Sequence, residues 1–403
     1  MNQPLRAVKL SDRIYWVGAV DWGVRDFHGY LTSRGTTYNA YLILADRIAL
    51  IDTVRAPFQD EMFQRIASVV APEKIAYVIS NHAELDHSGG LPAVVERVQP
   101  EGVFASPRGV EALAQHFHMK REIAAAKEGE TLSLGDATLS FVETPMLHWP
   151  ESMFTYFAEE RTLFSSDAFG MHLATSERFA DELDDAILEH EAAKYFANIL
   201  LPLYALVPKL LEKVRKLGLA IETIAPAHGP VRRRDVGRII ERYATWAAGR
   251  RANKAVVVYD TMWGSTETMA RAVGDGLAAA GVSVKLMPLK SCHRSDVATE
   301  LLDAGALIVG SPSLNSNMFP TVADMLTYLR GLKPRNLVGA AFGSYGWSGE
   351  SIGQVNDVLQ AMNVDLVGSG VRVQYVPDAA ALEECRALGA LVAERLQEAL
   401  QQR

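Results

Sequence analysis

A short segment, residues 81–90, places four metal-binding side chains within six positions, and a pair of glycines follows at once. These side chains are His82, Glu84, Asp86 and His87. The apolar run 75–80 leads into the segment, so the cluster is expected where a buried strand ends. Two imidazoles and two carboxylates suit iron, manganese or zinc better than soft metals. A lone histidine in a loop is usually just polar, but this grouping after a strand predicts a metal site.

Three later segments repeat the order of an apolar strand followed by one ligand-type residue. The alternating run 137–143 leads to His148 in a turn bounded by prolines. Two further apolar runs end in Asp167 and in His228. One such residue alone more often forms a turn. Taken together, the series predicts ligands that complete a two-metal centre.

This order of ligands resembles the metallo-β-lactamase fold in its di-iron form. Zinc hydrolases of that fold usually have a second histidine where this chain has Glu84, and the carboxylate makes the site better suited to iron. By the resemblance, one iron would be held by His82, Glu84 and His148. The other would be held by Asp86, His87 and His228, with Asp167 as the bridge. Because the imidazoles must be neutral and the carboxylates ionised, metal binding should weaken at low pH.

The C-terminal part of the chain shows buried strands that end in polar loops. The run 255–260 is apolar almost throughout, as expected of a buried parallel strand. The loop after it opens a helical pattern, and the free N–H groups and dipole of a helix start favour a phosphate. Neither Gly-x-Gly-x-x-Gly nor a lysine follows, which disfavours dinucleotides and nucleoside triphosphates. For this loop alone, an ordinary strand-to-helix turn with a threonine cap is the alternative.

Two more buried strands, 306–310 and 338–343, end in loops at the edge where open α/β sheets bind ligands. The three loops resemble those with which flavodoxin holds the phosphate and isoalloxazine ring of FMN, and Tyr345 and Trp347 could flank that ring. The FMN-binding residues implied are Thr261, Met262, Trp263, Gly264, Ser265, Thr266, Ser311, Pro312, Ser313, Leu314, Asn315, Ser316, Asn317, Ser344, Tyr345, Gly346 and Trp347.

Both halves in this order, over nearly the whole chain, resemble the two-domain, A-type flavodiiron proteins. The stretches 26–30 and 36–41 add to the resemblance. It implies an oxidoreductase that reduces dioxygen to water, nitric oxide to nitrous oxide, or both, at a di-iron centre fed by FMN. It also makes His28 and Tyr195 candidates for roles beside the irons or in the substrate pocket, with plain packing or hydrogen bonding equally open. The preference between the two gases stays undecided.

A chain of 403 residues is too long for one typical core, so two α/β domains are expected. We expect a metallo-β-lactamase-like αββα sandwich at residues 1–250 and a flavodoxin-like doubly wound parallel sheet at residues 254–403. The boundary is placed in the small, polar stretch 247–253.

Composition bears on location and partners. Residues 1–6 lack an apolar signal core and no run is long enough to span a bilayer, which favours the cytoplasm. Cys292 and Cys385 lie far apart without Cys-x-x-Cys spacing, which predicts reduced thiols and no fused rubredoxin-like site. Electrons would then come from a separate donor such as rubredoxin. The net charge of −8, with both signs interspersed, argues against a nucleic-acid partner.

The resemblance further implies a head-to-tail homodimer or tetramer, in which the FMN of one chain lies beside the irons of another. Two other classes of protein stay open as alternatives. One is a zinc hydrolase with an accessory flavodoxin domain, against which Glu84 and the FMN loops count. The other is an electron carrier with an inactive metal site, against which the complete ligand set counts. The remaining histidines are left outside the metal site: His116, His118, His172, His190 and His293.

Overall fold

The computed structural model describes residues 5–402, which divide into two units. Unit 1 contains residues up to 28, 32–195 and 203–244, and unit 2 contains residues 29–31, 196–202 and those from 245 onward. Residues 1–4, part of the stretch expected to lack a signal core, lie outside the described residues, as does residue 403. None of the described helices is long and apolar enough to cross a membrane.

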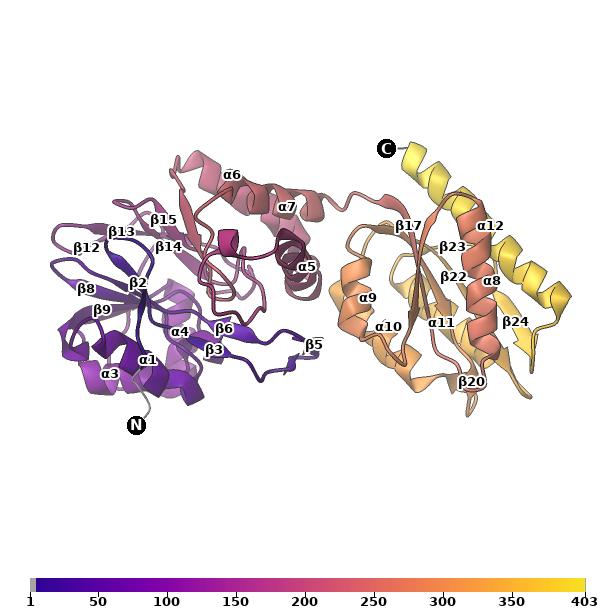
Figure 1. Ribbon diagram of the computed structural model, residues 1–403, viewed down its shortest axis with the longest axis horizontal. Helices are drawn as coiled ribbons and strands as arrows, with labels where there is room; N and C mark the ends of the chain where they lie inside the picture. The colour runs from indigo at the N-terminus through magenta and orange to yellow at the C-terminus, as the bar shows by residue number, and fades with distance from the viewer. Residues whose placement is uncertain (1–4, 403) are drawn as a thin grey trace. The chain divides into compact units, whose positions relative to one another are not determined.

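Two β-sheets form the centre of unit 1 (Figure 1). The seven-stranded sheet has the order β1 (Val8–Lys9), β2 (Ile14–Trp16), β7 (Tyr41–Ile43), β8 (Ile48–Ile51), β9 (Ile75–Ser80), β10 (Gly102–Ala105) and β11 (Ala124–Ala125). The five-stranded sheet has the order β12 (Thr131–Ser133), β13 (Thr138–Glu143), β14 (Met153–Phe157), β15 (Thr162–Phe164) and β16 (Thr223–Ala225). A two-stranded sheet pairs β3 (Ala19–Asp21) with β6 (Thr36–Tyr38).

The side chains of these strands alternate between two apolar cores. In β7, Tyr41 and Ile43 lie in the core between the two sheets, whereas Leu42 lies in the core beneath the helices. In β13, Leu139 and Phe141 share the core between the sheets, as their spacing predicts. Because successive side chains of a strand point to opposite faces, each sheet contributes one face to the shared core.

Helices cover the outer faces of the sheet pair (Figure 1). The helices α1 (Gln59–Ala67), α3 (Leu91–Val98) and α4 (Pro107–Phe117) pack on the seven-stranded sheet. The helices α6 (Val207–Lys216) and α7 (Val236–Ala248) lie beside β15 on the other side, and α5 (Asp185–Tyr195) precedes them. This layering is the expected αββα sandwich.

Unit 2 is built on a six-stranded sheet in which every strand pair is parallel. Its order is β18 (Ser283–Pro288), β17 (Ala252–Tyr259), β19 (Ala304–Gly310), β22 (Val338–Tyr345) and β23 (Asp365–Leu366), with β24 (Val371–Gln374) also on β22. The chain reverses direction across the sheet between β17 and β19, and the loops on either side of such a switch point bind ligands in doubly wound folds.

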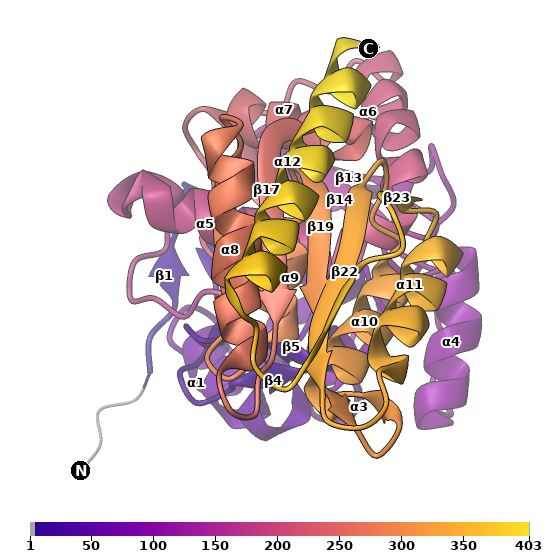
Figure 2. The same ribbon diagram turned by 90° about the vertical axis from the view of Figure 1, so that its right-hand side faces the viewer.

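Helices cover both faces of this sheet. Figure 2 shows α8 (Ser265–Ala279) and α12 (Ala379–Gln401) together over one face. The other helices of the unit are α9 (Arg294–Glu300), α10 (Pro320–Leu332) and α11 (Glu350–Ala361). In β17, Ala255 and Val257 face α8 and α12, while Val256 and Val258 are equally buried on the other side. The strand therefore reads as one continuous apolar run, and the expected doubly wound sheet is confirmed.

Two short segments from earlier in the chain complete unit 2. The Leu31 amide donates a hydrogen bond to Ser295 Oγ at 3.2 Å. The Tyr328 hydroxyl donates to Asn198 Oδ1 at 2.8 Å, and Asn198 Nδ2 donates to the Ser295 carbonyl at 3.1 Å. Residues 29–31 and 196–202 are thus held to α9 and α10 by polar contacts.

Candidate functional site

The ligand-type side chains of unit 1 all lie just beyond the ends of strands. His82 and Glu84 follow β9, and Asp86 and His87 lie in the four-residue helix α2 (Leu85–Ser88). The other three follow β13, β15 and β16, and they are His148, Asp167 and His228. Because these strand ends meet at one edge of the sandwich, the structure brings together all seven residues that the sequence singled out.

The chain after β9 is fixed by local contacts. The Asp52 carboxylate accepts hydrogen bonds from the Asn81 amide at 2.6 Å and from Asn81 Nδ2 at 2.9 Å. The Ser88 hydroxyl donates to the Ala83 carbonyl at 2.7 Å. A Cβ on Gly89 would lie 2.4 Å from the Leu85 carbonyl oxygen, so only glycine fits there. The glycine pair therefore lets α2 pack closely, which orients the ligand residues before it.

Asp167 lies at the centre of the cluster, with its two oxygens facing different imidazoles. Its Oδ2 lies 3.2 Å from Nε2 of His82 and 3.2 Å from Nε2 of His148. Its Oδ1 lies 3.3 Å from Nε2 of His87 and 3.5 Å from Nε2 of His228. The carboxylate thus divides the four rings into two pairs.

Each pair of rings has a second carboxylate of its own. Glu84 Oε2 lies 3.3 Å from Nε2 of both His82 and His148. Asp86 Oδ1 lies 3.3 Å from His87 Nε2, and Asp86 Oδ2 lies 3.1 Å from His228 Nε2. In two groups of potential metal ligands, each residue offers one donor atom, and these donor atoms all lie within 4.8 Å of one another. These groups are His82, Glu84, His87 and Asp167, and Asp86, His87 and His228.

Several of these donor atoms are buried without a hydrogen-bond partner among the described residues. They are Nε2 of His82, Nε2 of His87, both carboxylate oxygens of Asp86 and Oδ2 of Asp167. Buried polar atoms in proteins are nearly always paired, and those left over call for an ion or a water. Imidazole nitrogens and carboxylate oxygens aimed at shared points fit metal cations, so the residues present suit the group that the sequence implies.

Mutual charge stabilisation dominates the electrostatics of the cluster. Burial disfavours the charged form of His148, but the carboxylates of Asp167 and Glu84 beside it raise its pKa to about 10. Burial likewise opposes ionisation of Asp167, yet the positive charge of His87 and contacts with His148 hold its pKa well below the usual range. Neighbouring histidines likewise lower the pKa values of Glu84 and Asp86 against the effect of burial, so all three carboxylates favour the ionised form that binds a metal.

Both candidate residues near the cluster contact its carboxylates. The buried Tyr195 hydroxyl donates a hydrogen bond to Asp167 Oδ1 at 3.0 Å. His28 Nε2 lies 3.2 Å from Glu84 Oε1, and 74% of the His28 side chain is exposed. One contact thus comes from the interior of unit 1 and the other from its surface.

In unit 2, the three loops singled out in the sequence follow β17, β19 and β22, which are neighbours in the parallel sheet. Their carboxyl ends therefore share one edge. Strand β22 extends to Tyr345, so Ser344 and Tyr345, which were expected in the loop, belong to its end. Thr266 Oγ1, in the first turn of α8, lies 3.0 Å from Ser344 Oγ, and Ser313 Oγ donates to Ser351 Oγ at 2.8 Å. Gly264 precedes α8 with φ +91°, a conformation that favours glycine.

Two indoles at this edge are unusually open to solvent. Trp263 is 95% exposed and Trp347 is 85% exposed. Tyr345 is half-buried, and its ring lies close to the backbone of Gly349. Large exposed apolar groups mark places where another surface or ligand is expected. The hydroxyls, the helix start and the indoles fit a flat ring that carries a phosphate. The side chain of Trp263 is more exposed than that of Tyr345.

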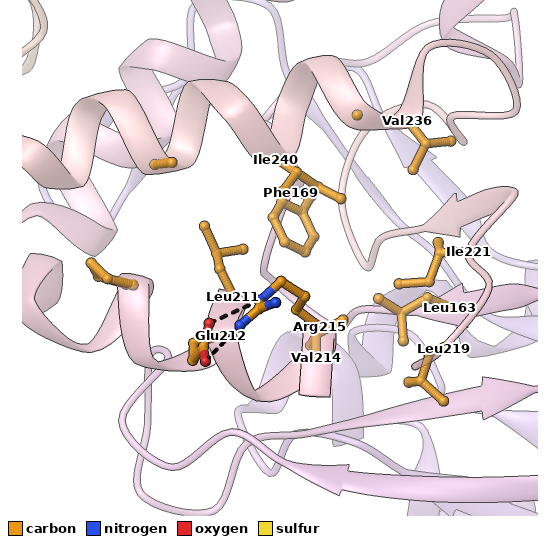
Figure 3. Close-up of a pocket in the computed structure, with 13 residues that line it drawn as sticks. Leu163, Phe169, Leu211, Glu212, Val214, Arg215, Leu219, Ile221, Val236 and Ile240 are labelled. Atoms are coloured by element: carbon orange, nitrogen blue, oxygen red, sulfur yellow. Dashed lines mark hydrogen bonds and ion pairs between the residues drawn. The ribbon is translucent and has the colours of Figure 1, made fainter. Parts of the chain in front are cut away.

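A separate hollow in unit 1 shares no residue with the metal-ligand cluster. It measures about 620 Å³ and lies between β15, α6 and α7 (Figure 3). Its lining is mostly aliphatic, with Leu163, Leu211 and Ile240 among the contributors. Its charged residues, Glu212 and Arg215, bind each other at 2.9 and 3.0 Å. The hollow therefore presents no converging polar groups of the kind that catalysis needs.

Each half of the chain matches a known protein family. Residues 36–229 match the family described as ODP family beta lactamase, and residues 257–389 match flavodoxin. Over 400 residues the chain is 48% identical to a nitric oxide reductase of Moorella thermoacetica, with 98% of this chain and 100% of that protein covered. The chain belongs to the flavodiiron protein family.

Two further flavodiiron relatives extend the match. A rubredoxin-oxygen oxidoreductase of Megalodesulfovibrio gigas is 44% identical, with 97% of this chain and 98% of that protein covered. The crystal structure of the flavodiiron protein from Giardia intestinalis matches with a TM-score of 0.95 at 34% identity, covering 100% of this chain and 99% of that one. The family resemblance, the fold class and the oxidoreductase class expected from the sequence are confirmed.

The cluster of ligand-type residues also makes contacts that the sequence did not indicate. Glu151 accepts a hydrogen bond from His82 Nδ1 at 2.8 Å. His172 is not among the ligands, but its ring lies 4.8 Å from that of His228, and its Nδ1 lies 2.8 Å from Thr36 Oγ1. Neither residue follows a strand in the pattern that identified the ligands, so no local signal pointed to either.

Proposed function

We propose that this flavodiiron protein reduces dioxygen to water, nitric oxide to nitrous oxide, or both, with electrons relayed through FMN from a rubredoxin-like donor. The observation that carries the proposal is the divided environment of Asp167. Its Oδ2 lies 3.2 Å from two imidazoles, and its Oδ1 lies 3.3 and 3.5 Å from two others. A carboxylate that serves two donor groups is suited to bridge two cations held side by side.

The proposed ligand sets follow from these contacts. His82, Glu84 and His148 would hold one iron. Asp86, His87 and His228 would hold the other, and Asp167 would bridge them. Three carboxylates among seven ligands favour iron over a softer metal. When bound, the irons and FMN together supply the four electrons that reduce dioxygen, and adjacent irons offer positions for both atoms of the gas.

The protein's own groups control protons and access. The buried Tyr195 hydroxyl donates its proton in a hydrogen bond to Asp167 Oδ1 at 3.0 Å. His28 lies at the exposed side, 3.2 Å from Glu84 Oε1, where it can exchange protons with solvent. These two residues are therefore proposed to supply the protons that gas reduction consumes.

The proposed FMN site is the loop edge of unit 2. The start of α8 leaves backbone N–H groups for the phosphate, and the hydroxyl-bearing residues Thr261, Ser265 and Thr266 lie in the loop and first turn there. The exposed indoles of Trp263 and Trp347 would pack against the isoalloxazine ring, a contact with a large apolar area.

Assembly, donor and location are further parts of the proposal. A relative is named a rubredoxin-oxygen oxidoreductase, which supports rubredoxin as the donor class here. The family resemblance supports a head-to-tail homodimer or tetramer, in which one chain's FMN serves the other chain's irons. Analytical ultracentrifugation of the FMN-loaded protein tests the oligomer. The cytoplasmic location expected from the sequence stays a prediction.

The deciding experiment measures iron, zinc and FMN in the purified protein and then gas consumption with reduced rubredoxin. We expect about two irons and one FMN per chain, with dioxygen or nitric oxide turnover. Zinc that persists after expression in iron-rich medium, with no gas turnover, would instead favour a hydrolase.

The variant Asp167→Ala tests the bridge. It should abolish gas reduction while FMN binding persists, because the bridging oxygens are lost and unit 2 is unchanged. The matched control Asp181→Ala removes a surface carboxylate that pairs with Arg233 at 3.1 Å. The control should keep full turnover. Full turnover in Asp167→Ala would refute the bridging assignment.

A further inference from the structure

A buried carboxylate stands behind one of the metal ligands. Glu151 Oε1 accepts a hydrogen bond from His82 Nδ1 at 2.8 Å and another from the Ala83 amide at 3.2 Å. Glu151 is 4% exposed and His82 is 1% exposed. The other ring nitrogen of His82, Nε2, faces Glu84 and Asp167. His82 thus connects a buried anion on one side to the metal-ligand cluster on the other.

The position of Glu151 is fixed by its backbone. Its carbonyl accepts a hydrogen bond from Ser106 Oγ at 2.6 Å, and Ser106 Oγ also accepts from the Gly109 amide at 3.0 Å as the cap of α4. The Glu151 carboxylate is therefore held in one place as the acceptor for His82 Nδ1.

The ring of His228, which faces the other oxygen of Asp167, has a weaker hydrogen-bond acceptor than His82 has. His228 Nδ1 donates to the Thr37 carbonyl at 2.6 Å, and that acceptor is neutral. A second buried carboxylate, Asp52, lies near the cluster, but its oxygens accept from the Asn81 amide and side chain. The carboxylate of Asp52 thus contacts Asn81, and its charge acts on His87 only through space, whereas Glu151 accepts a hydrogen bond directly from His82.

A carboxylate that accepts the second N–H of a ligating histidine fixes the ring tautomer and makes the ring a stronger electron donor. A stronger donor stabilises the ferric state of its iron over the ferrous state. We infer that Glu151 is a positioning residue that makes the iron held by His82, Glu84 and His148 the more readily oxidised of the two. This inference rests on the proposed di-iron function and deepens it, since it assigns an order to the two irons.

The test is a potentiometric titration of the iron-loaded protein, followed by electron paramagnetic resonance and Mössbauer spectroscopy. The variant Glu151→Gln keeps an acceptor of the same size for His82 but removes its charge. We expect the midpoint potential of one iron to rise by about 59 mV for each tenfold loss of ferric preference. The other midpoint should move less, so the mixed-valence signal at half reduction should shrink. The variant Glu151→Asp, which keeps the charge, should restore most of the separation.

The control Glu160→Gln removes a carboxylate of unit 1 that accepts from the Arg13 amide at 3.0 Å and belongs to neither ligand set. Its two midpoints should equal those of the wild type. Unchanged midpoints in iron-loaded Glu151→Gln, or an equal rise of both, would overturn the inference while leaving gas reduction by the wild type intact. Absence of iron from the wild type would instead contradict the proposed function.

If Glu151→Gln holds too little iron, cobalt titration of the metal-free protein replaces the potentials. Loss of such a partner typically weakens metal binding by about 10–100-fold. We expect this weakening in only one of the two steps by which cobalt binds. Equal weakening of both steps would overturn the assignment of Glu151 to the His82 side.

Discussion

At the scale of single residues, Tyr195 offers the sharpest test of proton supply. The variant Tyr195→Phe removes the hydroxyl that donates to Asp167 Oδ1 and leaves the ring packing in place. We expect gas turnover to fall by roughly 100-fold, at the low end for loss of a positioned proton donor, with iron retained.

The matched control for that variant is Tyr243→Phe. The Tyr243 hydroxyl is also buried in unit 1, but it accepts from the Phe169 amide at 2.7 Å and not from a ligand. This variant should lower stability by about 1–3 kcal/mol, because a buried N–H loses its acceptor, and turnover should be kept. Equal turnover in both variants would exclude a proton-donating role for Tyr195.

The ion pair between Lys254 and Glu300 makes a separate prediction about acid stability. Lys254 Nζ lies 2.8 Å from Glu300 Oε2. Burial raises the pKa of Glu300, but Lys254 outweighs it, so the pKa in the folded state is lowered. The resulting stability is present above the unfolded pKa of about 4.3 and is lost as pH falls through the lower folded pKa.

The variant Glu300→Gln should therefore be less stable than the wild type at pH 7, and the difference should shrink below about pH 4. Urea unfolding at a series of pH values measures this. Glu383→Gln, which removes an exposed partner of Arg386, should show little difference at any pH. A Glu300→Gln deficit that is constant down to pH 3 would contradict the assignment.

The residue scale also shows what a sequence can reveal. The seven ligand-type residues were predictable because each follows an apolar strand, which is a local pattern. Glu151 was not, because its contact with His82 spans 69 positions and depends on how β9 and β14 are placed. His172 was set aside for want of local context, yet folding brings its ring to within 4.8 Å of His228.

At the scale of elements, the start of α8 is a left-handed turn that the FMN proposal requires. Gly264 has φ +91°, and a Cβ there would meet nothing within 4 Å. Gly281, just beyond the other end of α8, has φ +79° and equally open surroundings. Alanine at either position should cost about 1–2 kcal/mol, because both need a left-handed backbone.

Only Gly264→Ala should weaken FMN binding, since only that turn precedes the helix start that receives the phosphate. Fluorescence titration of the FMN-free protein measures the affinity, and urea unfolding measures the shared cost in stability. An equal loss of FMN affinity in Gly281→Ala would mean that the effect is general to α8.

The loops of unit 2 show the same limit of prediction at this scale. The three strands were evident as apolar runs because parallel strands are buried on both faces. The choice of Tyr345 as a ring partner depends on side-chain conformation at the end of β22, which no local pattern fixes, and it stays a prediction; Trp263 is the more exposed of the two.

At the scale of the whole molecule, metal removal should affect the two units differently. Unit 1 contains every ligand-type residue of the cluster, and without cations its buried carboxylates and imidazoles hold one another charged. A cation at about 100 times its dissociation constant stabilises the fold it binds by about 2.7 kcal/mol.

Chelation should therefore lower the unfolding temperature of unit 1 and leave that of unit 2 unchanged. Differential scanning calorimetry of the full chain, with and without chelator, measures the unfolding transitions of the two units. Addition of FMN should shift only the transition of unit 2. A chelator-induced shift of both transitions by the same amount would contradict the separation.

The separate chain segments that make up unit 2 have a consequence for recombination between related genes. Its fold includes residues 196–202, where Asn198 accepts from Tyr328 and donates to Ser295. A crossover between genes of two relatives near codon 250 would separate these partners, although it would cut between the two matched families. Exchange of the C-terminal half should therefore succeed more often when codons 29–31 and 196–202 travel with it, so the unit of recombination is larger than the unit of sequence similarity.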